Sequence, residues 1–199
     1  MKRLFQWKTV GVAESARRAE LLERAYRHTR EHGLVAMSLR PLAQAVGSSP
    51  RVLLYLFGSK DGLVRALLER ARADELALLH AVRRDQGTLA EAAVALWRWL
   101  AAPEHGRLLA LWTEAYARSL VEPEGPWAGF AADTVEDWLG LLAGFAGDPV
   151  ERTLVLAVLR GAMRDQVAAV TAAGADVIVL EPPEDAPDPM PLIAALSRS

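Results

Sequence analysis

Two glycines, Gly47 and Gly58, bracket a segment that has room for only about two turns of helix, and this spacing constrains the fold of the first third of the chain. Ser49 and Pro50 open the segment as an N-cap and a first helical residue, because serine accepts a hydrogen bond from a free backbone N–H and proline lacks that group. The preceding segment begins with another capping serine, Ser38, and ends at Gly47. Two short helices joined by so tight a turn form a helix-turn-helix.

Helical patterns continue on both sides of this unit. Before it, Leu22, Ala25, Tyr26 and Thr29 follow the i, i+3, i+4, i+7 spacing of one helix face, which ends at Gly33. After it, a capping serine precedes a longer helix expected from residue 60 towards residue 80. Capping signals at 88–91 and 148–151 favour further helices, expected over 89–102, 104–120, 130–145 and 150–174. The sequence therefore predicts an all-α fold, with one unit at 13–80 and a helical bundle at 88–199.

The charges are divided unevenly along the chain. Residues 1–72 hold 14 Lys and Arg against 6 Asp and Glu, and residues 73–199 hold 9 against 19. A basic half beside an acidic half indicates a nucleic-acid or membrane partner for the basic half, and chance clustering on solvated helix faces is the alternative.

The short helix between the glycines has an unusual outer face. A projection at about 100° per residue places one apolar set towards the core, namely Val52, Leu53, Leu56 and Phe57. The opposite face presents Arg51, Leu54 and Tyr55. The second helix of a helix-turn-helix enters the DNA major groove, where Arg reaches guanine or phosphate, Tyr reaches phosphate and Leu reaches a thymine methyl. This face therefore predicts contact with double-stranded DNA.

The run from "AELLERAYRHTREHG" through "SLRPLAQAVGSSPRVLLYLFGSKDGLV" resembles the N-terminal domain of the TetR family of bacterial transcriptional repressors. Its most distinctive part is the block F-x-S-K-D/E-x-L, here Phe57 to Leu63. The resemblance covers about residues 13–70, and beyond them the length and helical pattern agree. The family commonly has Gly at the position of Arg51, Tyr at that of Leu54 and His at that of Leu56. The phosphate contacts of the family's Tyr and His therefore do not transfer to these two leucines. Tyr55 replaces them by its angle on the helix.

The resemblance implies a phosphate contact by Lys60 and a serine in the turn at Ser49. With the residues placed by geometry, the expected DNA-binding set is Ser38, Arg40, Ser48, Ser49, Arg51, Leu54, Tyr55 and Lys60. A basic amino-terminal arm with Lys2, Arg3 and Lys8 is a further candidate for the minor groove. The first unit is thus expected to be a DNA-binding domain with its connecting helix.

The second half is rich in tryptophan, and five of the six Trp residues lie there. Each one singly is explained by ordinary core packing, but together they favour an apolar pocket between helices. Resemblance to TetR-like repressors implies an inducer pocket in this half, coupled to the DNA-binding heads. The expected ligand-binding residues are Trp97, His105, Trp112, Tyr116, Trp127 and Trp138, with Glu114 as a further polar candidate.

A homodimer is expected to form through the later helices. Leu154, Val158, Gly161 and Arg164 or Asp165 follow one helical stripe, in which the glycine permits close approach of a partner helix. Two-fold symmetry would place two recognition helices about 34–36 Å apart, or a multiple of that, on a palindromic operator. The acidic, Pro-rich run at 176–191 has no predicted role, and whether the final short helix joins the dimer stays open.

Enzyme chemistry is not indicated. Asp133, Glu136 and Asp137 share a helix face, but no His stands in that helix, and no H-E-x-x-H or E-x-x-H occurs in the chain. G-x-S-x-G, Walker and dinucleotide motifs are also missing from the sequence. We therefore expect no catalytic residue, metal or cofactor.

The sequence favours a ligand-responsive transcriptional repressor, released from its operator by an apolar or aromatic small molecule. Two alternatives remain: an activator of the same fold, and a helical adaptor that binds protein through Leu54 and Tyr55. The chain has no Cys, no signal-peptide pattern and no apolar run long enough to cross a membrane, so we expect a cytoplasmic protein without a membrane partner.

Overall fold

The computed structural model describes residues 2–34, 37–83 and 87–172, and all regular secondary structure in these ranges is helical. The elements in chain order are α1 (Lys2–His32), α2 (Leu39–Ala45), α3 (Pro50–Phe57), α4 (Lys60–Arg83), α5 (Leu89–Leu100), the 3-10 turn η1 (Pro103–His105), α6 (Gly106–Val121), α7 (Phe130–Leu142) and α8 (Pro149–Ala172). The all-α prediction is confirmed for this part of the chain. The run at 176–191 lies outside the described residues.

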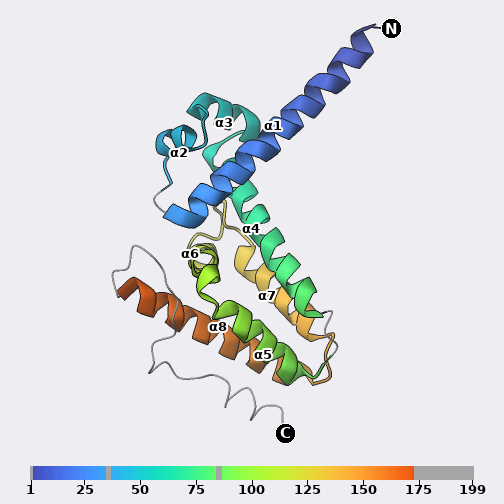
Figure 1. Cartoon of the computed structure of the whole chain (residues 1–199), viewed down its shortest axis with the longest axis vertical. Coiled ribbons are helices and arrows are strands. Elements are labelled where there is room, and N and C mark those ends of the chain that lie inside the picture. Colours follow the sequence, from blue (N-terminus) through green and yellow to red (C-terminus); the bar gives the residue numbers. More distant parts are fainter. Residues whose placement is uncertain (1, 35–36, 84–86, 173–199) are drawn as a thin grey trace.

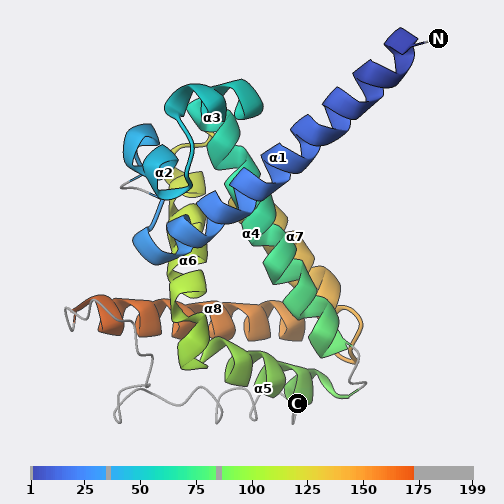
Figure 2. The ribbon, with the colours of Figure 1, turned by 45° about the horizontal axis from the view of Figure 1, so that its top comes forward.

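Helices α2 and α3 lie together beside α1 and the beginning of α4, at one end of the molecule (Figures 1 and 2). The predicted caps form here. The Ser49 hydroxyl accepts a hydrogen bond from the backbone N–H of Val52 at 3.3 Å, and the Ser59 hydroxyl accepts one from Gly62 at 2.9 Å. Ser38 has the extended backbone of an N-cap, but its side chain makes no capping bond, so that part of the prediction was wrong.

Two arginines of α1 contact the turn between α2 and α3 and the end of α3. The Arg24 guanidinium donates a 3.3 Å hydrogen bond to the carbonyl of Val46, and the Arg18 guanidinium lies 4.8 Å from the centre of the Phe57 ring. Leu53 is fully buried. Val52, which the projection placed in the core, is 38% exposed, because it lies at the edge of the apolar arc and no neighbouring helix covers it.

Helix α4 runs from this end into the other helices. Near its middle, the Tyr26 hydroxyl of α1 donates a 2.8 Å hydrogen bond to Asp74, and Arg70 pairs with Glu23 at 2.5 Å. Burial and the Asp74 carboxylate raise the pKa of Tyr26, so the phenol stays protonated as the donor. These contacts hold α1 against α4.

Between these two residues of α4, Arg72 pairs with Asp133 and Asp137 of α7, the latter at 2.7 Å. Two of the three carboxylates that were considered for metal chemistry therefore join two helices. In the described part of the chain, no cluster of three or more His, Cys, Asp or Glu side chains is arranged to hold a metal ion.

Helices α5 to α8 form the remainder, with α5 beside α8 at the end far from α2 and α3 (Figures 1 and 2). The capping box predicted for α5 is present: Thr88 donates its backbone N–H to Glu91 at 2.7 Å, and Glu91 returns a bond to the Thr88 hydroxyl at 3.2 Å. None of the helices in the described residues is both long and apolar enough to span a membrane. The basic amino-terminal segment is the first part of α1 rather than a separate arm.

Candidate nucleic-acid interface and ligand cavity

The outer face of α3 is open to solvent along its length. Tyr55 is 73% exposed, Leu54 is 38% exposed, and Arg51 is exposed at the start of the helix. Leu53 and Phe57 hold the opposite side of α3 in the core. A helix of about two turns thus presents a guanidinium, a phenol and an aliphatic side chain on one accessible surface.

Three cations surround this surface. Arg40 at the start of α2, Arg51 on α3 and Lys60 at the start of α4 are all exposed, and none has a hydrogen bond or ion pair with the part of the chain that the structure describes. By contrast, Arg24 and Arg70 are engaged in structural contacts. The cations at this end divide into those that hold the fold and those that remain available to a partner.

Two helix N-termini add positive potential to the same region. The first backbone N–H groups of a helix carry a partial positive charge and bind phosphate oxygens readily. The α3 terminus carries Ser49 and the α4 terminus carries Ser59 and Lys60. Exposed Ser38 and partly exposed Ser48 lie at the α2 terminus and in the turn. Together these groups form a surface suited to a phosphate backbone.

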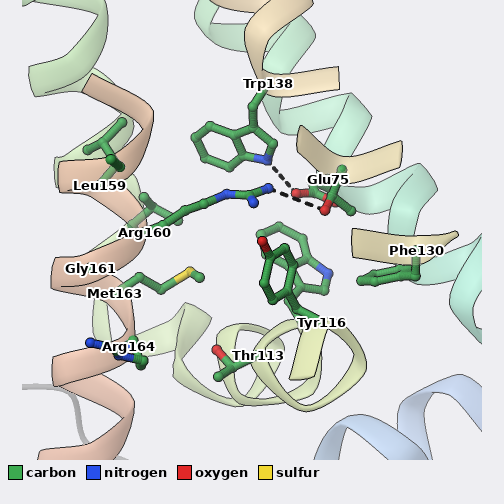
Figure 3. A pocket seen from close by; sticks show the side chains of 14 residues that line it. Glu75, Thr113, Tyr116, Phe130, Trp138, Leu159, Arg160, Gly161, Met163 and Arg164 are labelled. Atoms are coloured by element: carbon green, nitrogen blue, oxygen red, sulfur yellow. Dashed lines mark hydrogen bonds between the residues drawn. The ribbon is translucent and has the colours of Figure 1, made fainter. Parts of the chain in front are cut away.

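A cavity of about 380 Å³ lies between α4, α5, α6, α7 and α8 (Figure 3). This volume is in the range of small-molecule pockets. Its aromatic lining comes from Trp112 and Tyr116 of α6 and from Phe130 and Trp138 of α7. The remaining lining residues are Glu75, Leu100, Thr113, Thr134, Ala157, Leu159, Arg160, Gly161, Met163 and Arg164.

Glu75 is a buried acid in the wall of this cavity, with only 4% of its surface exposed. Its Oε1 accepts a hydrogen bond from the indole N–H of Trp138, while its Oε2 has no partner in the described structure. Burial raises the pKa of Glu75 to about 7, although the Trp138 hydrogen bond and the Arg160 charge oppose this shift. Near neutral pH the group is therefore divided between its acid and carboxylate forms.

Arg160 of α8 reaches into the cavity from the opposite wall (Figure 3). Its guanidinium donates a 3.2 Å hydrogen bond to the Thr134 hydroxyl and lies 4.8 Å from the centre of the Tyr116 ring. Burial lowers its pKa, an effect that Tyr116 and Glu75 oppose, but arginine remains charged. The cavity thus combines aromatic walls with a cation and a titratable acid.

Residues 21–67 match the sequence profile of the bacterial regulatory proteins, tetR family. The matched segment begins within α1 and ends within α4, so it contains the whole helix-turn-helix and the surface around α3. This segment has the sequence of the TetR-family N-terminal domain. The resemblance described from the sequence is thereby confirmed for the helix-turn-helix end of the chain.

Solved structures share the fold of this chain over most of its length. SCO7518 from Streptomyces coelicolor A3(2), described as a candidate transcriptional regulator, superposes with a TM-score of 0.71 at 18% identity, covering 92% of this chain and 99% of that one. The multidrug binding protein EbrR in complex with imidazole superposes with a TM-score of 0.64 at 23% identity. That alignment covers 92% of this chain and 90% of EbrR. GusR from Salmonella enterica superposes with a TM-score of 0.58 at 18% identity, and the alignment covers 92% of this chain and 95% of GusR. Comparison with curated protein sequences finds no significant match.

The structure brings only part of the expected ligand set together. Trp112, Tyr116 and Trp138 line the cavity. Trp97 packs half-buried against the core, and Trp127 is buried in the segment between α6 and α7. Both lie outside the cavity lining.

His105 and Glu114 also lie outside the cavity lining. The His105 ring stacks on Trp99 at 3.6 Å, and its Nδ1 lies 2.8 Å from the carbonyl oxygen of Trp99. These local contacts turn the imidazole towards α5. Glu114 instead contacts the segment after α1, where it accepts a hydrogen bond from the backbone N–H of Leu34.

Sequence reasoning missed two charged residues of the cavity, Glu75 and Arg160. A signal existed for Glu75, because Leu67, Ala71 and Leu79 occupy the same i±4 ridge and all are buried. A single Glu in a buried ridge indicates a carboxyl with a special partner. No comparable pattern marks Arg160, whose position depends on how α8 crosses α6 and α7.

Proposed function

We propose that this protein is a TetR-family, ligand-responsive repressor that binds a palindromic operator as a homodimer and leaves it when a small molecule enters the cavity. The observation that carries the DNA-binding part is the accessible α3 face, where Arg51 and Tyr55 point away from the core beside cations without protein partners. Residues 13–80 would form the DNA-binding unit and residues 88–199 the ligand-binding and dimerisation unit.

The roles at the DNA follow from chemistry. Arg51 would contact a guanine edge or a phosphate, Tyr55 a phosphate and Leu54 a thymine methyl. Ser38, Arg40, Ser48, Ser49 and Lys60 would bind the backbone and fix the register of α3 in the major groove. Such a set gives both sequence preference and a steep dependence on salt.

The cavity supports the effector part of the proposal. It is lined by residues of five helices, one of which, α4, also carries Lys60 at the proposed DNA surface. The shared fold with EbrR, a multidrug binding protein solved with imidazole and with proflavin, agrees with a small-molecule ligand. A ligand changes DNA binding only if its affinity differs between the two conformations of the heads.

Exposed apolar side chains on α8 support the homodimer. Val150 and Leu154 of α8 are 65% and 43% exposed, whereas Gly161, which was expected in the same stripe, lines the cavity. Exposed apolar side chains on one helix suit packing of a second copy. We place the dimer at its operator in the cytoplasm.

The proposal is tested by footprinting the purified protein on the DNA upstream of its own gene, beside a shuffled duplex of equal length. Two symmetric protected half-sites are expected, with centres about one helical turn apart or a multiple of it. Protection of one asymmetric half-site would contradict binding as a homodimer. Equal binding to the shuffled duplex would contradict recognition of a specific operator. No binding at all would favour the adaptor alternative, in which Leu54 and Tyr55 contact protein.

A further inference from the structure

The cavity contains two opposite charges that do not form a salt bridge. Glu75 belongs to α4 and Arg160 to α8, and their side chains approach the same space from facing walls (Figure 3). Among the described residues, the guanidinium of Arg160 is paired with no carboxylate, and its contacts are the Thr134 hydroxyl and the Tyr116 ring. Buried charges are normally paired, so this cation has capacity for an anion.

The charge balance of the lining points the same way. In the cavity wall, Glu75 and Arg160 face each other, so their charges sum to zero when Glu75 is ionised and to one positive charge when it is protonated. With Glu75 protonated, an organic cation would be repelled by Arg160, whereas an anion would be attracted to it. The protonated form of the site therefore favours anionic over cationic ligands.

The unpaired polar atoms of the cavity suit an acceptor group. The indole N–H of Trp112 and the hydroxyl of Thr113 are buried without a partner in the described structure, and both can donate. The guanidinium of Arg160 supplies further N–H donors. The Glu75 Oε2 without a partner also becomes a donor when it carries a proton. A carboxylate provides two acceptor oxygens for such donors.

We propose that the effector is an aromatic carboxylate, whose oxygens pair with Arg160 while its ring lies among Trp112, Tyr116 and Trp138, and that Glu75 takes up one proton when it binds. This inference rests on the effector cavity proposed above and specifies its ligand class. The proton enters because a second anion beside Glu75 makes its ionised form less favourable.

Other charges around Glu75 do not replace this partner. Arg72 on α4 and Asp137 on α7 face it, but they are engaged with each other at 2.7 Å. Tyr116 on α6 lies over Arg160. The titration of Glu75 is therefore governed mainly by its burial, by Arg160 and by what the cavity holds.

The test uses three probes with the same ring system: naphthalene-2-carboxylate, its neutral carboxamide, and naphthalen-2-ylmethylammonium. Each is titrated calorimetrically into the full-length protein at pH 7, with tryptophan fluorescence as a second signal. The carboxylate is expected to bind at least about tenfold more tightly than either analogue, as a charge-assisted pair would give. Arg160→Met is expected to abolish that preference. Arg107→Met, which changes an arginine outside the cavity lining, is expected to keep it.

Proton uptake gives an independent readout. Calorimetry of the carboxylate in buffers of different ionisation enthalpy is expected to show uptake of about one proton at pH 8 and far less at pH 6. Affinity is expected to fall by up to about tenfold per pH unit above 7, because Glu75 must regain its proton. Glu75→Gln is expected to bind the carboxylate without proton uptake.

Each contrary result has a distinct meaning. Preference for the ammonium probe, or a carboxylate preference that survives Arg160→Met, would overturn the anion site. Absence of proton uptake in the native protein would overturn the role of Glu75. If none of the probes binds at millimolar concentration, the effector cavity of the proposed function fails as well, whereas footprinting tests the DNA-binding part separately.

Discussion

The backbone N–H of Leu34 donates a 2.9 Å hydrogen bond to Oε2 of Glu114, across a separation of 80 residues. Leu34 follows α1 at the DNA-binding end, and Glu114 lies on α6 between the cavity residues Thr113 and Tyr116. A movement of α6 around a ligand would therefore act directly on the segment that precedes the helix-turn-helix.

Removing this contact is expected to loosen the DNA-binding end. Glu114→Ala leaves a partly buried N–H without its acceptor, which costs about 1–3 kcal/mol of unfolding free energy. Amide hydrogen exchange at Leu34 is expected to accelerate strongly. In Glu114→Gln, which retains a carbonyl acceptor, the exchange rate at Leu34 is expected to lie between those of the native protein and Glu114→Ala. Glu124→Ala at an exposed position serves as the control. Unchanged exchange at Leu34 in Glu114→Ala would show that the contact does not restrain this segment.

Cations around α3 are expected to make different contributions to DNA binding. Arg51→Ala should weaken operator binding by about 1–3 kcal/mol and relax the base preference at one position. Lys60→Ala should weaken binding to all sequences and reduce the salt slope by about one. Fluorescence anisotropy on operator and shuffled duplexes measures both effects. Arg98→Ala, on α5 and remote from α3, should change neither, and equal losses in all three variants would contradict the assignment.

Glu75 gives the stability of the protein a definite pH dependence. Its pKa is raised from 4.5 to about 7 by burial, so between these values the native state holds a proton that the unfolded state has lost. Unfolding free energy contributed by this group therefore falls as pH rises from about 4.5 to about 7, by roughly 3 kcal/mol at most. Glu75→Gln should be more stable than the native protein above pH 7, and the difference should disappear near pH 4.

Glu91 provides a control of opposite sign for this pH series. Hydrogen bonds from the backbone and hydroxyl of Thr88 lower the pKa of Glu91. Its stabilising contribution is therefore present at neutral pH and is lost as pH falls through the lowered pKa. Denaturant melts of Glu91→Gln and Glu75→Gln at several pH values should show opposite trends, and parallel trends would contradict the burial effect at Glu75.

Two glycine substitutions separate backbone strain from packing. A Cβ at Gly58 or at Gly140 would meet no atom within 4 Å, but Gly58 has φ 79° at the end of α3 whereas Gly140 lies inside α7. Gly58→Ala is expected to destabilise by about 1 kcal/mol through its left-handed backbone. Gly140→Ala is expected to stabilise by roughly 0.5–1 kcal/mol. Thermal melts that gave both variants the same sign would contradict this reasoning.

The proposed dimer surface is expected to be sensitive to charge on α8. Leu154→Glu places a carboxylate in the exposed apolar stripe and should shift sedimentation towards the monomer. Val121→Glu introduces the same charge at a 74% exposed position of α6 and should leave the dimer intact. If Val121→Glu dissociates the dimer and Leu154→Glu does not, the interface lies on α6.

Local chemistry made the starts of several helices predictable. Ser49 and Thr88 cap their helices as expected, because capping depends on neighbouring backbone groups in the sequence. The exposure of Val52 was not predictable from the helix period, since the width of a buried face depends on which other helices cover it. The unbroken helix from Lys2 was also missed, because the basic residues Lys2, Arg3 and Lys8 were interpreted as a separate arm.

The cavity was predictable in kind but not in composition. Aromatic content indicated an apolar pocket, and Trp112, Tyr116 and Trp138 do line one. His105 was chosen for its chemistry alone, and its stacking on Trp99 could not be inferred from spacing. The pair Glu75 and Arg160 comes from helices separated by most of the second half, so only the tertiary arrangement brings them together.

The central claim is that the outer face of α3 binds DNA, and a salt series on upstream DNA tests it most directly. Affinity of the native protein for a labelled upstream fragment would be measured by anisotropy from low to physiological salt, beside Arg51→Ala. We predict that the association constant falls steeply with salt, by about 0.9 logarithmic units per phosphate contact for each tenfold rise in salt. We also predict weaker binding by Arg51→Ala. Absence of binding at low salt, to both this fragment and a random duplex, would contradict the claim.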